Sequence, residues 1–417
     1  MKKVVFYFKN SGVSEVDFSR PNLGNPGVGG TQFLFMTQPY YLQAYALKNG
    51  LDYEFILLTN EISKLPDEAI AYSVRSDEEA VEKANRLGAD LFIFRPMEDD
   101  VSSGRTHLYA NSGMKLLGWA HNAYSRGLLN TYSDMVAYKA HVCVCHEQLD
   151  ALLDKRIYDK STFVFNGFES EHAQPVPFKE RSAVDVVYIG SIIPAKGFHM
   201  LAEAWPHVLE RVPNARLKVI GSGKVYDRNA TLGNYEIAQA DYEARFMPYL
   251  TNANGELIPS VEFLGLMGSE KFDVMKRAAV GVVNPTGMTE NCPGSALEFQ
   301  ACGIPVVSAA KGGLWDTVET GKTGVLVKNV TALSAAIIHI LVNGKKRSYL
   351  GNNASAFVAR KFDYEAVCRK WLELFEVVLS DAEVKSVRPY PKSQFWREKR
   401  AARYCFYWLR TLGLYGK

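Results

Sequence analysis

The sequence predicts an α/β protein made of two doubly wound, Rossmann-like domains, and three observations lead to this prediction. The chain has 417 residues, which fits two or three domains that each bury a core. In the first half, short apolar runs alternate with longer amphipathic ones, as parallel strands alternate with covering helices. After a polar linker with two prolines, Glu171–Ala183, the same alternation starts again.

The first half contains short runs that are rich in β-branched and aromatic residues and apolar on both faces. Strands buried between two layers of helices have this composition, whereas strands with one solvent-exposed face alternate apolar and polar residues. The expected strands are Lys3–Phe8, Tyr53–Leu58, Leu91–Phe94, Lys115–Trp119 and Val142–Cys145. The expected helices between them are Thr31–Lys48, Asp77–Leu87 and Glu147–Leu153.

The second half repeats this order of elements. The expected strands are Val184–Ile189, Arg216–Ile220, Val261–Leu264, Val280–Asn284 and Pro305–Ser308. The expected helices are Phe198–Arg211, Glu270–Ala278, Ser295–Cys302 and Ala332–Val342. We therefore expect Rossmann-like domains over 1–175 and 176–380 and a C-terminal tail over 381–417. The strands of the two sheets are expected to end at one shared cleft, the usual ligand site of this architecture.

Charge and cysteine content narrow the class of protein. The 48 lysines and arginines against 45 acidic residues leave a net charge of +3, which gives no reason to expect a nucleic-acid partner. The six cysteines are scattered without zinc-type spacing, which favours a reducing compartment. The apolar run Val4–Phe8 is shorter than the ~7–15 residues of a signal-peptide core, and no run reaches the ~18 residues of a membrane span. A cytoplasmic protein is expected.

The segment Lys385–Lys417 departs from the even charge balance of the chain. It contains nine lysines and arginines and one acid, Glu398, together with many aromatic and leucine side chains. Basic and aromatic residues on one helix suit an anionic membrane surface, on the inner face of the cell membrane. A terminal helix that packs its aromatic side chains onto the N-terminal domain would have the same composition. The sequence leaves both interpretations open.

The densest group of functional signals lies within residues 280–325. A buried strand is followed by a short loop that presents Glu290 and by a helix that begins near Ser295. The unpaired N–H groups and partial positive charge of a helix N-terminus suit a phosphate. Glu298, one turn into the helix, is placed to accept hydrogen bonds from a ribose diol, and Glu290 from a hydroxyl of the group that the phosphate carries. A nucleotide, a diphosphate and a sugar would then lie in a row.

The same segment contains an ordered set of motifs. The set consists of Glu290-x7-Glu298, Ala301-Cys302-Gly303-Ile304-Pro305-Val306-Val307, Gly312-Gly313 and Gly321-x-Thr323-Gly324. It resembles the donor-site signature of retaining GT-B glycosyltransferases, family 4, and the ordered set is far more specific than either glutamate alone. The resemblance implies an N-terminal acceptor-side domain, a C-terminal donor domain, and transfer of a hexosyl group from a nucleotide diphosphate to an acceptor hydroxyl with retention of configuration.

A second stretch is similar to the same family. Residues 188–197 (YIGSIIPAKG) look like the first strand and loop of its C-terminal domain, where a lysine and often an arginine neutralise the donor diphosphate. Lys196 is in register with the lysine, whereas Ser191 stands at the arginine position and carries no charge. The resemblance implies catalytic roles for Lys196 and Glu290. It implies donor contacts for Gly190, Ser191, Gly223, Gly265, Asn291, Cys292, Pro293, Gly294, Ser295 and Glu298.

The N-terminal domain carries two weaker signals. The glycines of Gly27–Gln32 allow a close backbone approach ahead of a long helix, and their spacing is not the G-x-G-x-x-G of dinucleotide oxidoreductases. In the resembling family, the loop with Gly29 and Gly30 lies beside the sugar phosphate and the acceptor; by itself it is equally a tight turn. His121 lies at the C-terminal edge of an expected strand, and its family position implies a catalytic role at the transferred sugar.

The resemblance implies that neither a metal nor another cofactor is required. The sequence has no D-x-D triplet, the metal-chelating device of the other large glycosyltransferase fold. The expected donor is a UDP- or GDP-linked sugar, and the expected acceptor is a saccharide or lipid-linked saccharide of bacterial surface polysaccharide or glycolipid assembly. Three alternatives stay open: a nucleotide-sugar epimerase of the same fold, a phosphorylase with a lysine-linked cofactor, and a non-catalytic, membrane-associated assembly protein.

Overall fold

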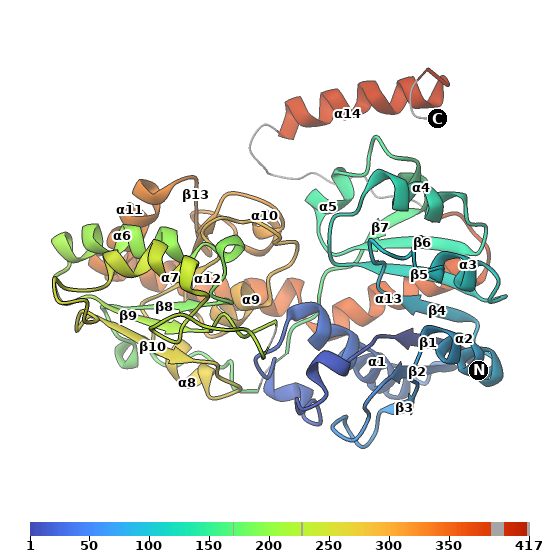
Figure 1. The fold of residues 1–417 in the computed structure, drawn as a ribbon, viewed down its shortest axis with the longest axis horizontal. Coiled ribbons are helices and arrows are strands. Elements are labelled where there is room, and N and C mark those ends of the chain that lie inside the picture. Colours follow the sequence, from blue (N-terminus) through green and yellow to red (C-terminus); the bar gives the residue numbers. More distant parts are fainter. Residues whose placement is uncertain (170, 227, 385–395, 415–417) are drawn as a thin grey trace. The chain divides into compact units, whose positions relative to one another are not determined.

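The chain forms two compact units in the computed structural model, which describes residues 1–169, 171–226, 228–384 and 396–414 (Figure 1). The first unit consists of Met1–Pro21, Thr31–Gly167 and the chain from Tyr364 onward, and the second of Asn22–Gly30 and Phe168–Asp363. This division departs from the expected domains in two places. The loop Asn22–Gly30 belongs to the second unit, and the helix that begins at Tyr364 belongs to the first.

Within the described residues, the first unit contains a seven-stranded parallel sheet in the order β3-β2-β1-β4-β5-β6-β7. Its strands are β1 (Lys2–Tyr7), β2 (Tyr53–Thr59), β3 (Ile70–Ser73), β4 (Leu91–Phe94), β5 (Lys115–Ala120), β6 (Tyr138–Cys143) and β7 (Ser161–Phe163). The helices are α1 (Gly30–Lys48), α2 (Asp77–Leu87), α3 (Arg105–Ala110), α4 (Arg126–Asp134), α5 (His146–Asp150), α13 (Tyr364–Leu379) and α14 (Trp396–Thr411).

Successive side chains of β1 face opposite layers of helices, as a fully covered sheet requires. Val5 and Tyr7 belong to a buried core shared with α2, α3 and α4. Phe6 packs edge-on against Trp119 of β5 and Trp371 of α13. Because α13 covers this sheet, it cannot belong to a domain over 176–380. The periodicity of a helix reveals its apolar face but not which sheet that face covers.

The described part of Phe168–Asp363 contains a six-stranded parallel sheet in the order β10-β9-β8-β11-β12-β13. Its strands are β8 (Asp185–Ile189), β9 (Arg216–Ile220), β10 (Val261–Gly265), β11 (Val280–Val283), β12 (Val306–Ala309) and β13 (Gly324–Val327). The helices are α6 (Phe198–Arg211), α7 (Ala240–Phe246), α8 (Lys271–Met275), α9 (Gly294–Ala301), α10 (Leu314–Thr317), α11 (Val330–Val342) and α12 (Gly344–Lys361).

This second sheet is also covered on both faces. Val186 and Tyr188 of β8 contribute to a core shared with α6, α7 and α11. Val187, between them, contributes to a separate core with α8 and α9. Figure 1 shows α6 and α11 over the same sheet, and the two helices pack against each other. The predicted fold class, two parallel-sheet Rossmann-like domains, is therefore confirmed.

Most predicted elements are found with small shifts at their ends. The strand expected at Val142–Cys145 ends earlier, because the Sγ of Cys145 accepts a hydrogen bond from the backbone N–H of Gln148 at 3.3 Å and caps α5. Three strands were not predicted, β3, β7 and β13, and all three are sheet edges. Edge strands are short and half exposed, so they lack the long apolar run that predicts a central strand. None of the helices in the described ranges is long and apolar enough to cross a bilayer.

Candidate functional site

Two loops of the second unit leave its sheet where the strand order reverses. The strands β8 and β11 are neighbours there. The loop after β8 contains Gly190–Gly197, and the loop after β11 leads through Glu290 to α9. In open parallel sheets, ligands bind beyond the carboxyl ends of the strands at this reversal. The two stretches that the sequence analysis singled out therefore meet at the expected ligand position of the unit.

Lys196 and Glu290 form an ion pair across these two loops. The Nζ of Lys196 lies 2.5 Å from the Oε1 of Glu290, and their side chains are only 14% and 11% exposed. Burial by itself lowers the pKa of the Lys196 amine, but the charge of Glu290, followed by that of Tyr226, outweighs it and raises the pKa. The lysine is therefore held as a cation beside a carboxylate.

Asn284 organises the loop that carries Glu290. Its Nδ2 donates to the Glu290 Oε1 at 2.8 Å and to the carbonyl of Met288 at 2.9 Å, while its Oδ1 accepts from Thr286 and from the backbone N–H of Gly287. Its φ of 33° is in the left-handed region, which is costly for a residue other than glycine and concentrates at functional loops. The sequence analysis missed this residue; the available signal was a polar amide directly after a fully apolar strand.

Gly312 and Gly313 support the same loop from the side of β12. The backbone N–H of Gly313 donates to the carbonyl of Glu290 at 2.8 Å. A Cβ on Gly313 would lie 1.4 Å from the carbonyl oxygen of Asn291, and one on Gly312 would lie 2.4 Å from that of Glu290. Only glycine allows this approach. The glycine pair of the motif thus fixes the position of the Glu290 backbone.

Glu298 lies one turn into α9 and forms a buried ion pair with Lys271 of α8. The Lys271 Nζ donates to the Glu298 Oε1 at 2.6 Å, and the two side chains are 4% and 6% exposed. The same amine donates to the carbonyl of Asn25 at 2.9 Å. Lys271 therefore joins Glu298 to the loop Asn22–Gly30. The sequence analysis missed it, because a lysine at the start of an amphipathic helix is most often solvent-exposed.

The residues predicted to hold a phosphate lie where α9 begins. Pro293 is the N-cap with an extended backbone, Gly294 is exposed and Ser295 is half-buried. Cys292, just before them, is buried. The exposed first turn leaves the positive end of the α9 dipole accessible on the same loop as Glu290.

Two of the predicted glycines, Gly190 and Gly265, lie against Gly221, which follows the strand between theirs. The backbone N–H of Gly221 donates to the carbonyl of Gly265 at 2.7 Å, and a Cβ on Gly221 would lie 1.9 Å from the carbonyl oxygen of Gly190. The backbone N–H of Gly223 instead donates to Ile237 at 2.8 Å. The loops after β8, β9 and β10 therefore pack directly against one another.

Ser191, at the position of the family's arginine, is buried among these loops. Its Oγ donates to the carbonyl of Ser222 at 3.4 Å, so the hydroxyl is engaged with backbone. In this arrangement Ser191 does not replace an arginine.

Gly29 and Gly30 end the segment that belongs to the second unit, and Gly30 begins α1. Two contacts hold the segment there besides that of Lys271. The guanidinium of Arg228 donates to the carbonyl of Gly27 at 3.0 Å, and a Cβ on Gly27 would lie 3.1 Å from the carbonyl oxygen of Met267. The glycine-rich loop is therefore anchored to the unit that carries Glu290 and Glu298.

His121 follows β5 in the first unit, as predicted, and is buried. Its ring packs against those of Trp119 and Phe35. Burial, with a smaller contribution from the charge of Arg95, lowers the pKa of His121 to about 3. The ring is therefore neutral near pH 7 and can exchange hydrogen bonds but cannot supply positive charge.

We expect the free energy of unfolding to decrease as pH falls from about 6.5 toward 3. Burial likewise lowers the pKa of His141 to about 3, with a smaller effect of Lys155. Unfolding lets both histidines return to a pKa near 6.5 and take up protons, so lower pH favours the unfolded state by up to about 1.4 kcal/mol per pH unit and histidine. When urea unfolding is measured at several pH values, the free energy of unfolding should depend less steeply on pH in His141→Gln than in the wild type. His207→Gln, at a 62% exposed side chain, should keep the wild-type slope.

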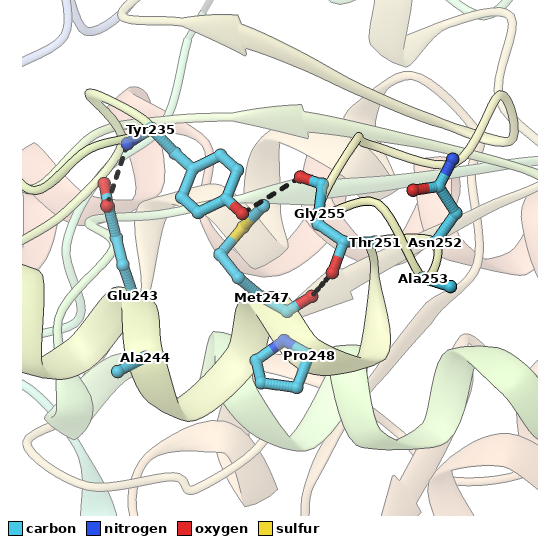
Figure 2. Close-up of a pocket in the computed structure, with 9 residues that line it drawn as sticks. All are labelled: Tyr235, Glu243, Ala244, Met247, Pro248, Thr251, Asn252, Ala253 and Gly255. Atoms are coloured by element: carbon cyan, nitrogen blue, oxygen red, sulfur yellow. Dashed lines mark hydrogen bonds between the residues drawn. The ribbon is translucent and has the colours of Figure 1, made fainter.

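A separate pocket of about 670 Å³ lies between α7 and the chain that leads to β10 (Figure 2). Its polar groups are engaged within the protein. The carboxylate of Glu243 accepts from the backbone N–H groups of Tyr235, Ile237 and Ala238 at 3.0, 2.8 and 3.0 Å, and the Tyr235 hydroxyl donates to Gly255 at 3.1 Å. None of the predicted site residues is among the described residues that line it. The carboxylate of Glu243 therefore has a structural role in this pocket, where it binds three backbone N–H groups.

A family of known proteins resembles this chain over the second unit. The family Glycosyl transferases group 1 matches residues 183–343, which include Lys196, Lys271, Glu290 and Glu298. The two parallel sheets and this match are features that the chain shares with GT-B glycosyltransferases.

Individual proteins are similar at low identity. The GDP-mannose-dependent monoacylated alpha-(1-6)-phosphatidylinositol monomannoside mannosyltransferase of Corynebacterium glutamicum is 28% identical over 186 residues, 42% of each chain. Sucrose-phosphate synthase from Thermosynechococcus elongatus has a TM-score of 0.69 at 19% identity, over 92% of this chain and 100% of that one. Anabaena Alr3699/HepE in complex with UDP has a TM-score of 0.64 at 16% identity, over 90% and 100%. The two structures show the shared fold. The chain spans about half the length of the curated relatives it matches.

Proposed function

We propose that the protein is a retaining, family 4 glycosyltransferase that moves a hexosyl group from a UDP- or GDP-linked sugar to an acceptor hydroxyl. The observation that carries the proposal is the Lys196–Glu290 pair, which lies where the strand order reverses within the matched domain. A cation and a carboxylate side by side offer what such a donor needs. The cation compensates the negative charge of the diphosphate, and the carboxylate accepts a hydrogen bond from the sugar.

The atoms of the pair leave room for both contacts. An amine has three N–H donors; in this structure Glu290 and Tyr226 are partners of Lys196, which leaves one donor for a phosphate oxygen. Lys196 and Asn284 both contact the Oε1 of Glu290. We assign its Oε2 to a sugar hydroxyl. The pair can therefore stay intact while the donor binds.

In the proposed reaction, the bond between the anomeric carbon and the diphosphate oxygen breaks, and a bond to the acceptor oxygen forms on the same face. The acceptor proton passes to the departing diphosphate, so no side-chain base is needed. Lys196 and the backbone N–H groups of Gly294 and Ser295, at the start of α9, stabilise the charge that develops on the leaving oxygen. Because Lys196 supplies this charge, we propose that no metal is required. Glu298 is assigned to the ribose diol.

The acceptor is proposed from the relatives. The mannosyltransferase of Corynebacterium glutamicum is named for a phosphatidylinositol monomannoside, a lipid-linked saccharide. A saccharide or lipid-linked saccharide of surface polysaccharide or glycolipid assembly is the corresponding acceptor class for this chain.

Nucleotide-dependent thermal stabilisation tests the proposal. UDP or GDP is expected to raise the melting temperature, by the equivalent of about 2.7 kcal/mol at a hundredfold excess over Kd. The shift should persist in the presence of a chelator. Lys196→Met should weaken the affinity for the diphosphate roughly 10- to 100-fold, because it removes a charge-assisted hydrogen bond, and should leave the affinity for uridine or guanosine unchanged.

The matched control is Lys345→Met, which removes an exposed lysine of α12. Equal UDP affinity in the two variants would contradict the diphosphate role of Lys196. A shift that requires manganese would contradict the metal-independent part of the proposal.

A further inference from the structure

The cationic face of α14 is turned toward the first unit and is neutralised there. The guanidinium of Arg400 donates twice to the Asp150 Oδ1, at 3.0 and 2.9 Å, and Arg403 pairs with the Oδ2 of the same carboxylate. Asp150 is only 3% exposed. Nearer the end of the helix, Arg410 pairs with Asp159 at 3.3 Å. Tyr404, on the same side, packs against the core of the unit.

The opposite face of α14 is apolar and exposed. Trp408 is 59% exposed and Leu412, four residues on, is 67% exposed. We call this the outer face; it consists of the exposed residues Ala401, Ala402, Cys405, Trp408, Leu409 and Leu412. A helix held to a protein normally buries its apolar side and exposes its charges. The reversed orientation leaves a contiguous apolar surface that calls for a partner.

We infer that the outer face of α14 docks on an anionic lipid surface. A helix of this kind lies in the plane of the interface, with tryptophan and leucine at the headgroup boundary and cations beside them. Arg397 is exposed at one end of the helix, and Lys399, which pairs with Glu147 at 3.9 Å, is 47% exposed there. In the sequence, Lys385, Arg388 and Lys392 precede it. Clustered lysines and arginines strengthen the attraction to an anionic surface.

Charge favours a lipid surface over a second copy of the chain as the occupant. Two copies that met through the outer face would bring two strongly basic tails together, and like charges repel. An anionic bilayer presents the opposite sign and accepts the apolar side chains as well. The ion pairs of Arg400 and Arg403 with Asp150 hold the helix in the orientation that such docking needs.

Cys405 provides a direct reporter. It lies on the outer face one turn before Trp408 and Leu409, and it is exposed, whereas the other five cysteines are buried. A polarity-sensitive fluorophore attached to Cys405 on the folded full chain should shift to shorter wavelengths with vesicles of phosphatidylcholine and phosphatidylglycerol. The shift should be much smaller with phosphatidylcholine alone, and salt should weaken it. No shift with anionic vesicles, or equal shifts with both compositions, would overturn the inference.

Vesicle sedimentation of unlabelled protein separates the outer face from other surfaces. Trp408→Ser/Leu412→Ser should weaken binding to anionic vesicles about tenfold or more, since it removes two large apolar side chains from the contact. Leu47→Ser, at a 73% exposed leucine of α1, should bind as the wild type does. Wild-type binding by the double variant would overturn the inference. So would a concentration-dependent dimer that the double variant abolishes, because a second copy would then cover the face. Neither experiment requires catalytic activity, so a failure here leaves the proposed reaction untouched.

Discussion

Replacing Glu290 by alanine is expected to lower kcat about 100-fold while changing the Kd for UDP or GDP by less than about threefold. In our proposal this carboxylate accepts a hydrogen bond from the transferred sugar, and a hydrogen bond to a charged group contributes roughly 1.5–3 kcal/mol. The nucleoside diphosphate has no sugar at that position, so its affinity does not include this contact. A loss confined to kcat is the signature of an interaction made with the reacting group.

The measurement pairs steady-state kinetics on the donor with calorimetric titration of the product nucleotide. Glu262→Ala is the matched control, because Glu262 is an exposed carboxylate on β10 of the same unit. It should change neither quantity. Normal turnover by Glu290→Ala would remove Glu290 from the site. A large loss of UDP affinity would instead place the carboxylate on the nucleotide side of the donor.

Replacing Lys271 by methionine is expected to cost about 3–5 kcal/mol of folding free energy. The carboxylate of Glu298 would then be buried without a cation, and leaving one partner of a buried ion pair uncompensated is strongly destabilising. The loop Asn22–Gly30 would lose a hydrogen bond at Asn25 as well. The melting temperature, followed by circular dichroism, should fall by roughly 10 °C.

A double variant identifies the cause. Lys271→Met/Glu298→Gln removes both charges and should recover most of the lost stability, because no ion is then left buried. Lys276→Met is the control on the same part of the chain. It breaks the Lys276–Asp273 pair, in which the aspartate side chain is 74% exposed, and should cost less than about 1 kcal/mol. Equal melting temperatures for Lys271→Met and Lys276→Met would show that the buried pair does not stabilise the unit.

Half of the candidate site could be predicted from the sequence because its signals are local. Glu290 lies between an apolar strand and a helix start, and Lys196 lies in the loop after another apolar strand. Both loops follow strands whose carboxyl ends share one edge of a parallel sheet, so their proximity follows from the alternation of elements. The structure places the two side chains in contact, at 2.5 Å. The roles of the remaining predicted residues stay predictions.

The other half depends on contacts between positions far apart in the chain. Lys271 contacts the carbonyl of Asn25, and no periodicity relates these two residues. Asn284 holds its position through a left-handed backbone conformation that its neighbours impose. The residue type alone does not predict this conformation. The edge strands β3, β7 and β13 escaped prediction because half-exposed strands need no continuous apolar run.

By itself, the sequence determined that the chain forms two parallel sheets covered by helices, and through a family resemblance it singled out Glu290 and Lys196 as site residues. Apolar periodicity and the alternation of strands and helices are local features of the sequence, so they can be recognised without knowledge of the tertiary contacts. Only the tertiary structure decided that α13 covers the first sheet and that Lys271 compensates Glu298. It also decided that α14 turns Arg400, Arg403 and Arg410 inward and Trp408 and Leu412 outward. Each of these depends on which distant surface a segment meets, and an amphipathic pattern has the same appearance whichever of its faces is buried.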